Sequence, residues 1–425
     1  MSRAYYYCGP CGKGYCPFDE QARLSPRKLT PAAEEVTVQA GILGDGFAEA
    51  AEKILPVQTG LHIAESTVER VTEDAGARLG GWLEKGFTLG EEARWCWHRD
   101  KEGRRVAYFS TDATGVPQQG PNAAKAEGRM PYVAMVYNPP PEKPQKQAAE
   151  VSGEVAHEPI DAAAGEADSA RPGGGPAEPV SAAAAEPAAP VSGGTVRQVE
   201  PGGGSADKPP KKMQVRYLAG LYTLPLLGLL LRRQAAQVGA EDAEQWIGLS
   251  DGGSGLENFL QSNFNRPNLV LILDFHHPAG RLEELAKSWY EQDETLAKQQ
   301  AAQWCKILKH QGGEALLERL KAQPPPGRRA ARKLYDEMLT YVENHKHKMN
   351  YPEYLKKGWY IGSGAVESAC KTVVGQRLKQ AGMRWGESGT DNVCHLRALF
   401  RSEKGQWQAF WARSLNKRSI IHQPK

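Results

Sequence analysis

A long stretch without large apolar side chains divides this sequence in two. From about residue 139 to residue 212 the chain consists mostly of Ala, Gly, Pro, Glu and Ser. Such a segment cannot bury enough apolar surface to offset the entropy lost on ordering, so we expect it to be a disordered insertion. The fold of the 425-residue chain is therefore decided by the parts on either side, which are long enough to build a large core.

Both sides of the insertion contain runs that predict β-strands. Runs of β-branched, aromatic and aliphatic residues predict strands at 106–112, 131–137, 213–218, 245–250 and 268–274. The spacing of apolar and turn-forming residues further predicts helices at 224–238 and 256–264 and a turn at 115–118. Three strands followed by alternating helices and strands is the order of the ribonuclease H-like fold. We therefore expect an α/β protein with a mixed sheet flanked by helices.

Helical patterns occupy most of the sequence after the last predicted strand. Residues 281–358 have the spacing of amphipathic helices, interrupted by Pro and Gly at 324–327, and predict a helical insertion. A final helix is expected from about Gly364, with Glu367 in its first turn. The catalytic domain would then be assembled from 101–138, 213–280 and the final helix with its basic tail at 359–425.

Three cysteines cluster near the start of the chain. Cys8, Cys11 and Cys16 lie within residues 1–30, and the first two form a Cys-x-x-Cys pair that is similar to half of a zinc ribbon. A structural zinc site needs four ligands in a tetrahedron, and the second Cys-x-x-Cys pair is missing. We expect a partial zinc-ribbon-like segment, with Zn²⁺ as its candidate structural ion.

Residues 31–100 predict a helical region. Its two short helices, expected at 47–55 and 66–74, are separated by a break that contains Pro and Gly. Two short helices joined by a turn are typical of a helix-turn-helix module, whose second helix enters a major groove of DNA. The alternative is a plain helical hairpin, because the second helix carries acidic as well as basic side chains.

Charge is distributed unevenly along the chain. The whole sequence has 53 Lys and Arg against 50 Asp and Glu, but residues 356–425 have 13 against 4. A polyanion such as double-stranded DNA would be expected to bind this tail. No apolar run reaches the roughly 18 residues of a membrane span, and the first residues lack the pattern of an export signal. We expect a cytoplasmic, nucleoid-associated protein that does not bind membranes.

Three acidic residues lie at predicted strand ends or helix starts, the positions where α/β proteins usually carry their catalytic residues. Asp112 lies in a predicted strand, Asp251 follows another, and Glu367 lies at a helix start. Three converging carboxylates would hold two Mg²⁺ or Mn²⁺ ions, which activate the attacking oxygen and stabilise the leaving oxygen at phosphorus. Taken singly, each acid is also typical of a turn or a helix cap.

Asp274 and His277 follow the last predicted strand. A carboxylate and an imidazole three positions apart at a strand end predict a supporting pair or an alternative pair of metal ligands. The competing interpretation is a cap for the next helix, because Pro278 follows directly. A rival assignment makes Asp274, instead of Asp251, the second metal-binding acid, although the strand order favours Asp251.

Basic side chains and a tryptophan follow Glu367 along the expected final helix. Cations at these positions would contact the phosphates of a DNA duplex, and the indole would stack on an exposed base. The alternative is a solvated basic face, which is a common origin of such charge runs. The candidate DNA-binding residues are Lys371, Arg377, Lys379, Arg384 and Trp385.

Together these segments resemble the bacterial insertion-sequence transposases of the DDE class, closest to the Kra-type group, which is related to the Mutator-like transposases. The resemblance is carried by the motifs YYYCGPCGKGYCPFDE, STDATGVP, LSDGGSGLENFL, LDFHH and GSGAVESACKTVVGQRLKQAGMRW. It implies that Asp112, Asp251 and Glu367 are the catalytic acids and that Asp274 and His277 form an accompanying pair.

The resemblance also implies a function. Such a transposase binds the terminal inverted repeats of its own element, cleaves a strand with water and joins the freed 3′ hydroxyl to target DNA. A homo-oligomer is expected, because two element ends must meet in one complex. Two other classes stay open: a ribonuclease H-like nuclease without strand transfer, and a non-catalytic DNA-binding derivative.

Overall fold

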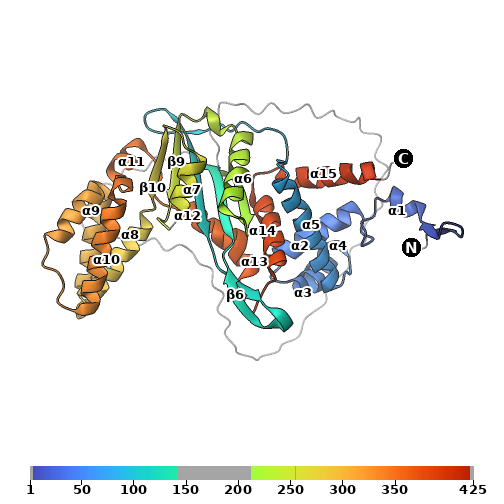
Figure 1. The fold of residues 1–425 in the computed structure, drawn as a ribbon, viewed down its shortest axis with the longest axis horizontal. Coiled ribbons are helices and arrows are strands. Elements are labelled where there is room, and N and C mark those ends of the chain that lie inside the picture. The colour runs from blue at the N-terminus through green and yellow to red at the C-terminus, as the bar shows by residue number, and fades with distance from the viewer. Residues whose placement is uncertain (1–2, 141–211, 254, 422–425) are drawn as a thin grey trace, which may run out of the picture. The chain divides into compact units, whose positions relative to one another are not determined.

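The computed structural model describes residues 3–140, 212–253 and 255–421 of the protein. The predicted disordered insertion lies outside these residues, apart from its two ends. Within the described residues the chain forms a six-stranded sheet flanked by helices, and two small antiparallel hairpins (Figure 1). The predicted α/β class with a mixed, helix-flanked sheet is confirmed.

The five main strands of the sheet match the five predicted ones. They are β4 (Arg105–Ala113), β7 (Tyr132–Asn138), β8 (Gln214–Gly220), β9 (Gln245–Ser250) and β10 (Leu269–Leu273). Their order across the sheet is β10-β9-β4-β7-β8. β4, β9 and β10 are mutually parallel, whereas β7 is antiparallel to both of its neighbours, β4 and β8. The sheet is therefore mixed, with its parallel half at the β10 edge.

The predicted insertion connects two strands that are neighbours in the sheet. β7 and β8 pair along their whole length, from Tyr132 opposite Gly220 to Asn138 opposite Gln214. The side-chain amide of Asn138 also donates to the side chain of Gln214 over 2.9 Å. The antiparallel ladder thus continues to the last residue of β7, close to the point where the insertion begins.

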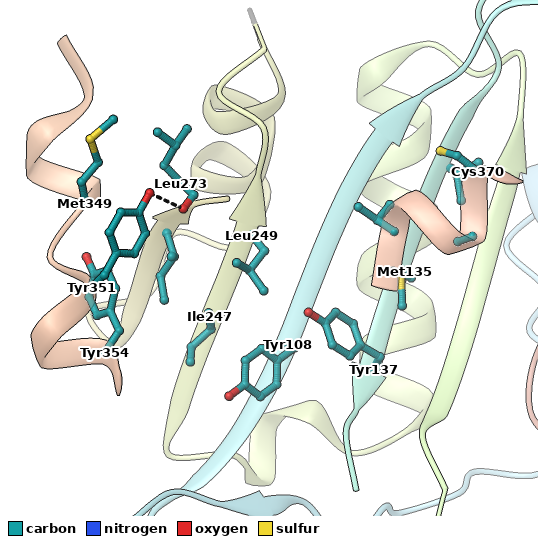
Figure 2. Packing of buried hydrophobic residues seen from close by; sticks show 14 of the residues in the cluster. Tyr108, Met135, Tyr137, Ile247, Leu249, Leu273, Met349, Tyr351, Tyr354 and Cys370 are labelled. Atoms are coloured by element: carbon teal, nitrogen blue, oxygen red, sulfur yellow. Dashed lines mark hydrogen bonds between the residues drawn. The ribbon is translucent and has the colours of Figure 1, made fainter. Parts of the chain in front are cut away.

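Side chains alternate between the two faces of the sheet, and each face has its own apolar cluster. Tyr108 and Ile247 belong to the first cluster, which Figure 2 shows in part, and Phe109 and Trp246 belong to the second. The first face is covered by α12 (Gly364–Ala369), by the π-helical segment Cys370–Gly375 and by helices of the helical insertion. The second face is covered by α6 (Leu224–Gln237) and α7 (Leu256–Asn263), and α14 (Glu387–Arg401) packs along the edge strand β8. α5 (Glu65–Glu84) and α15 (Gln406–Ile421) belong to the same apolar cluster.

The helical insertion packs beside β10, the edge strand of the parallel half (Figure 1). It consists of α8 (His276–Trp289), α9 (Glu294–Lys321), α10 (Arg329–His345) and α11 (Tyr351–Lys357). The predicted break at 324–327 falls between α9 and α10. At the other end, the hydroxyl of Tyr351 donates to the backbone carbonyl of Leu273 over 3.0 Å (Figure 2). The insertion begins at His276, earlier than predicted, because α8 starts almost directly after β10.

The amino-terminal helices join the same core as the sheet. They are α2 (Pro31–Leu43), a continuous helical stretch made of α3 (Phe47–Glu49), a π-helical turn (Ala50–Ile54) and α4 (Leu55–Thr59), and then α5. One face of α5 packs on α14 (Glu387–Arg401), with Gly76 against the backbone of Asn392. Only the outer face of α5 is thus open to a partner, and the helix-turn-helix interpretation stays a prediction.

Two sequence predictions about local structure are wrong. Residues 115–118 were expected to form a turn, but β5 (Val116–Gln119) pairs with β6 (Lys125–Arg129) in a separate hairpin. The predicted helical region also does not extend to residue 100, because β3 (His98–Arg99) pairs with the start of β4. Both segments are short, and each is a strand because it pairs with the next strand along the chain in a local hairpin.

Candidate metal centre

Three aspartates lie at the carboxyl ends of three adjacent, parallel strands. We call this end of the sheet the acidic edge. Asp112 is the penultimate residue of β4, Asp251 directly follows β9, and Asp274 directly follows β10. β9 and β10 remain in register to their last residues, and the backbone amide of Asp274 donates to the carbonyl of Ser250 over 2.8 Å. By strand alternation all three aspartates lie on the face that α12 covers, where adjacent strands are about 4.8 Å apart.

Asp274 is fully buried, and its carboxylate accepts hydrogen bonds from His276 and Ser363. Its side chain has 0% exposure. Oδ1 accepts the backbone amides of His276, at 3.1 Å, and Ser363, at 3.0 Å, and Oδ2 accepts the Ser363 hydroxyl at 2.7 Å. A buried carboxylate requires such partners, because an unpaired charge is costly away from water.

Ser363 connects this buried aspartate to Glu367. The Ser363 hydroxyl lies 2.7 Å from Asp274 Oδ2 and 3.0 Å from Glu367 Oε1. A hydroxyl has one proton and can donate to one carboxylate at a time. The hydroxyl can therefore satisfy only one of the two carboxylates at a time, which leaves carboxylate oxygens available to a cation.

The loop before α12 brings Glu367 to this position. The backbone amide of Phe275 donates to the carbonyl of Ile361 over 2.9 Å, so the loop runs beside the start of α8. A side chain at Gly362 would lie 3.2 Å from the ring of His276, which explains why glycine fits there. α12 begins two residues later and projects Glu367 from its first turn.

His277 completes a group of three metal-ligand types. One ligand atom each of Asp274, His277 and Glu367 lies within 4.8 Å of the other two. Asp274 is buried, whereas His277 and Glu367 are exposed and line an open cavity of ≈ 410 Å³. Carboxylates suit Mg²⁺ and Mn²⁺, and imidazole is a common ligand of transition metals, so the donor set fits a divalent cation.

Among the residues that the structure describes, Asp274, His277 and Glu367 are the group whose ligand atoms lie close enough together to share a metal ion. This group differs from the three predicted catalytic acids. It contains Glu367 of that trio, together with Asp274 and His277, which the sequence offered as a supporting pair or alternative ligands; metal binding by these residues stays a prediction. Asp112 and Asp251 lie at the same sheet edge but outside this group. The Asp251 carboxylate accepts the amide of Gly253 over 2.8 Å, a bond typical of the turn residue that was the alternative interpretation.

Asp112 has a neighbour that sequence reasoning missed. The thiol of Cys370 lies 3.5 Å from Asp112 Oδ2 and can donate to it. Burial, and then the charge of Asp112, raise the pKa of this thiol well above its usual range, so it stays protonated. Cys370 is three residues after Glu367, and this contact therefore joins the Asp112 strand to the helix that carries Glu367.

Three of the five predicted DNA-binding side chains are exposed. Lys371 lies in the π-helical segment, and Lys379 and Arg384 follow α13 (Gln376–Leu378). The ammonium of Lys379 donates to the hydroxyl of Thr114, two residues after Asp112. Lys379 is thus near the acidic edge, and the role of all three cations in DNA binding stays a prediction.

The prediction is wrong for Arg377 and Trp385, which are core residues. Arg377 is 1% exposed and Trp385 is 6% exposed. The guanidinium lies over the rings of Phe47, at 4.5 Å, and Trp385, at 4.8 Å, and its Nε donates to the carbonyl of Gly41 over 2.9 Å. Both side chains hold the amino-terminal helices against the segment after α12 and cannot reach DNA.

The three amino-terminal cysteines are not brought together as metal ligands. β1 (Tyr6–Cys8) and β2 (Lys13–Tyr15) form a hairpin, with Cys11 in its turn and Cys16 before α1 (Pro17–Gln21). The Cys11 thiol lies 3.9 Å from the carbonyl of Cys8. Within the described residues the three thiols do not all lie within the spacing that the Asp274 group meets, and zinc binding by this segment stays a prediction.

Comparison of the chain with protein-family models and with curated proteins gives no match. Among the described helices, none is both long enough and apolar enough to cross a lipid bilayer. The interpretation of the site therefore rests on its own residues.

Proposed function

We propose that the protein is a DNA transposase that uses a divalent-cation centre to cleave and join DNA strands. The observation that carries this proposal is the convergence of Asp274, His277 and Glu367 at the sheet edge where Asp112 and Asp251 also lie. Divalent cations in such a centre supply an activated oxygen nucleophile and stabilise the leaving oxygen at phosphorus. Mg²⁺ or Mn²⁺, as two ions, is the cofactor that this function requires.

The strand order supports a ribonuclease H-like catalytic domain. An antiparallel meander of β4, β7 and β8 is followed along the chain by β9 and β10, which add to the other side of β4 in parallel. This places the first strand at the centre of the sheet and the acidic residues at the ends of the parallel strands. Ligands of open α/β sheets bind at that end of the strands.

The chain's own residues have distinct roles in this proposal. Asp274 and Glu367 would hold the cation, with Ser363 keeping the two carboxylates at a fixed separation. His277 would contribute a nitrogen ligand from the exposed side of the cavity. Lys371 and Lys379 would contact the DNA backbone beside the acidic edge, since both are exposed.

The test is strand cleavage of DNA that carries the ends of the element, measured with Mg²⁺ or Mn²⁺. We expect Glu367→Gln and Asp274→Asn to abolish cleavage while DNA affinity stays within about threefold, because one ligand among many phosphate contacts is changed. Glu337→Gln is the matched control, because Glu337 is exposed on α10 and pairs with Lys333. Full cleavage by Glu367→Gln would contradict the proposal.

A pre-cleaved DNA end separates the open classes. A transposase joins its 3′ hydroxyl to target DNA, whereas a nuclease gives hydrolysis and no joined product. Wild-type protein that binds the DNA without cutting it would be a non-catalytic derivative. Comparing Asp251→Asn with Asp274→Asn shows which of the two acids holds the cation that cleavage depends on.

A further inference from the structure

The cavity beside Glu367 is lined by a positively charged side chain, Arg281, that has no role in the proposed metal centre. His277, Arg281 and Glu284 line this cavity from α8, at positions that share one side of the helix. Arg281 is thus one helical turn from a candidate metal ligand, and its side chain is exposed. A positive charge in this place faces the same space as the carboxylate of Glu367.

The helical insertion holds the Arg281 side chain in place. The guanidinium carbon lies 4.5 Å from the centre of the Tyr341 ring, which belongs to α10. The Tyr341 ring in turn packs edge-on against His345 at 4.8 Å. Stacking restricts an arginine to the plane of the aromatic face and leaves the N–H edge of the guanidinium open to an acceptor.

Tyr341 itself lies close to the acidic edge. Burial outweighs the opposing charge of Arg281 and, with smaller contributions from the charges of Asp251 and Asp274, raises the pKa of Tyr341 to about 12. The ring is thus a neutral phenol at physiological pH, in contact with the arginine and within electrostatic range of the two aspartates. It gives Arg281 a rigid support beside the acids without adding charge.

Arg281 has no ion-pair partner in the described part of the chain. No carboxylate oxygen lies within 4.0 Å of its guanidinium nitrogens, although Glu284 and Glu367 line the same cavity. By contrast, Arg328 pairs with Glu291 and Arg332 pairs with Asp336 on the surface of the insertion. A guanidinium that is supported by an aromatic ring and has no carboxylate partner, next to a cation centre, is suited to a phosphate group.

We infer that Arg281, supported by Tyr341, binds a phosphate oxygen of the DNA strand that is cleaved at the Asp274, His277 and Glu367 centre. This inference rests on the proposed function and adds the residue that stabilises charge on the phosphate. Arg281 touches the substrate, whereas Tyr341 is a positioning residue. It also gives the helical insertion a role: α10 carries the ring that orients an arginine of α8.

The decisive experiment compares Arg281→Ala and Arg281→Lys with wild type in single-turnover cleavage at saturating DNA with Mg²⁺. Removal of one preorganised donor to a developing charge lowers rates by about 100-fold or more, and we expect this loss for Arg281→Ala. Lysine should restore part of the rate, because it keeps the charge but not the planar fork. DNA affinity, measured in Ca²⁺, should change by less than about threefold.

Two further variants control for structural effects. Arg266→Ala is the matched control, because Arg266 is exposed and lies over the Trp246 ring at 4.4 Å, but at the opposite end of β10 from Asp274. It should cleave at the wild-type rate. Tyr341→Ala should lower the rate about tenfold, and Tyr341→Phe, which keeps the stacking ring, should restore it.

The inference is overturned if Arg281→Ala cleaves within threefold of wild type, or if its loss lies wholly in DNA affinity. Binding of inorganic phosphate, measured by calorimetry without DNA, separates this inference from the proposed function. If wild type fails to cleave DNA but binds phosphate, and Arg281→Ala does not, the phosphate site stands and the transposase proposal falls. Equal phosphate binding by wild type and Arg281→Ala overturns the inference in either case.

Discussion

At the scale of single residues, burial separates side chains that the sequence places in one group. Lys371 and Arg377 are both basic and lie six positions apart after Glu367. Lys371 is exposed, whereas Arg377 is enclosed by Phe47 and Trp385. Burial lowers the pKa of Arg377 to about 10, which leaves it charged at neutral pH. Its interaction with two rings and a carbonyl therefore replaces water as its solvation.

This difference gives opposite expectations for two alanine variants. Arg377→Ala should lower the free energy of unfolding by about 2–4 kcal/mol, because it removes a buried, hydrogen-bonded cation, and should leave the salt dependence of DNA binding unchanged. Lys371→Ala should leave stability within about 0.5 kcal/mol and reduce the salt slope by about 1. Urea denaturation and DNA titrations at several salt concentrations measure both. A stable Arg377→Ala protein that has lost DNA binding would contradict this assignment.

Asp100 provides a test of acid stability. Its buried carboxylate accepts hydrogen bonds from the indole of Trp359, at 3.1 Å, and from the guanidinium of Arg104, at 2.9 Å. Burial by itself would raise the pKa of Asp100, but these bonds outweigh it and hold the pKa below its ordinary value of 3.8. The stabilisation from ionised Asp100 is therefore present at neutral pH and is lost as the pH falls through the lowered pKa.

We expect Asp100→Asn to be less stable than wild type at pH 7 by about 1.5–3 kcal/mol, the range for hydrogen bonds to a charged group. The difference between the two proteins should shrink below about pH 4, where Asp100 of the unfolded wild-type chain begins to bind a proton that the folded protein does not yet bind. Urea denaturation at intervals between pH 7 and pH 3 measures it. A constant difference over that range would show that the charge of Asp100 does not contribute.

At the scale of helices and strands, close backbone contact fixes where α5 lies on α14. A β-carbon at Gly76 would lie 2.4 Å from the carbonyl oxygen of Asn392, so no larger residue fits without moving a helix. Gly81 is on the same helix, and a β-carbon there would meet nothing within 4 Å. The two glycines thus make a matched pair in one helix.

Gly76→Ala should destabilise the protein by about 1–3 kcal/mol, because the contact is with backbone that cannot rotate away. Gly81→Ala should instead stabilise it by about 0.5–1 kcal/mol, because alanine is the better helix former in open space. Thermal or urea unfolding of the two variants measures both effects. The same sign for both substitutions would mean that α5 does not pack on α14 as described.

Elements with a local sequence signal could be predicted, whereas contacts between distant segments could not. The five main strands were predicted correctly because an apolar or alternating run, such as that of β10, is a local signal. The burial of Arg377 could not be predicted, because its partner Gly41 is 336 residues away. The grouping of Asp274 with Glu367 likewise depends on a loop that docks beside α8, and the Ser363 that joins them was visible only as part of a Gly-Ser-Gly stretch.

At the scale of the whole molecule, the long low-complexity segment is attached to the sheet at two neighbouring strand ends. Because Asn138 of β7 is opposite Gln214 of β8, a short connection can close the same antiparallel pair. We expect replacement of residues 142–205 by a short Gly/Ser linker to preserve the fold. Closing a shorter loop costs less entropy, so the free energy of unfolding should rise by about 1–2 kcal/mol. Loss of cooperative unfolding in this variant would contradict the pairing of β7 with β8.

The central claim is that Asp274, His277 and Glu367 form a divalent-cation centre at the acidic edge of the sheet. The most direct measurement is the anomalous scattering of Mn²⁺ in crystals of the full-length protein soaked with that ion. We expect a peak about 2 Å from carboxylate oxygens of Asp274 and Glu367, the distance of hard-cation ligands. It should disappear in Glu367→Gln crystals. A soaked crystal with no peak between these residues, or with its peak elsewhere, would contradict the claim.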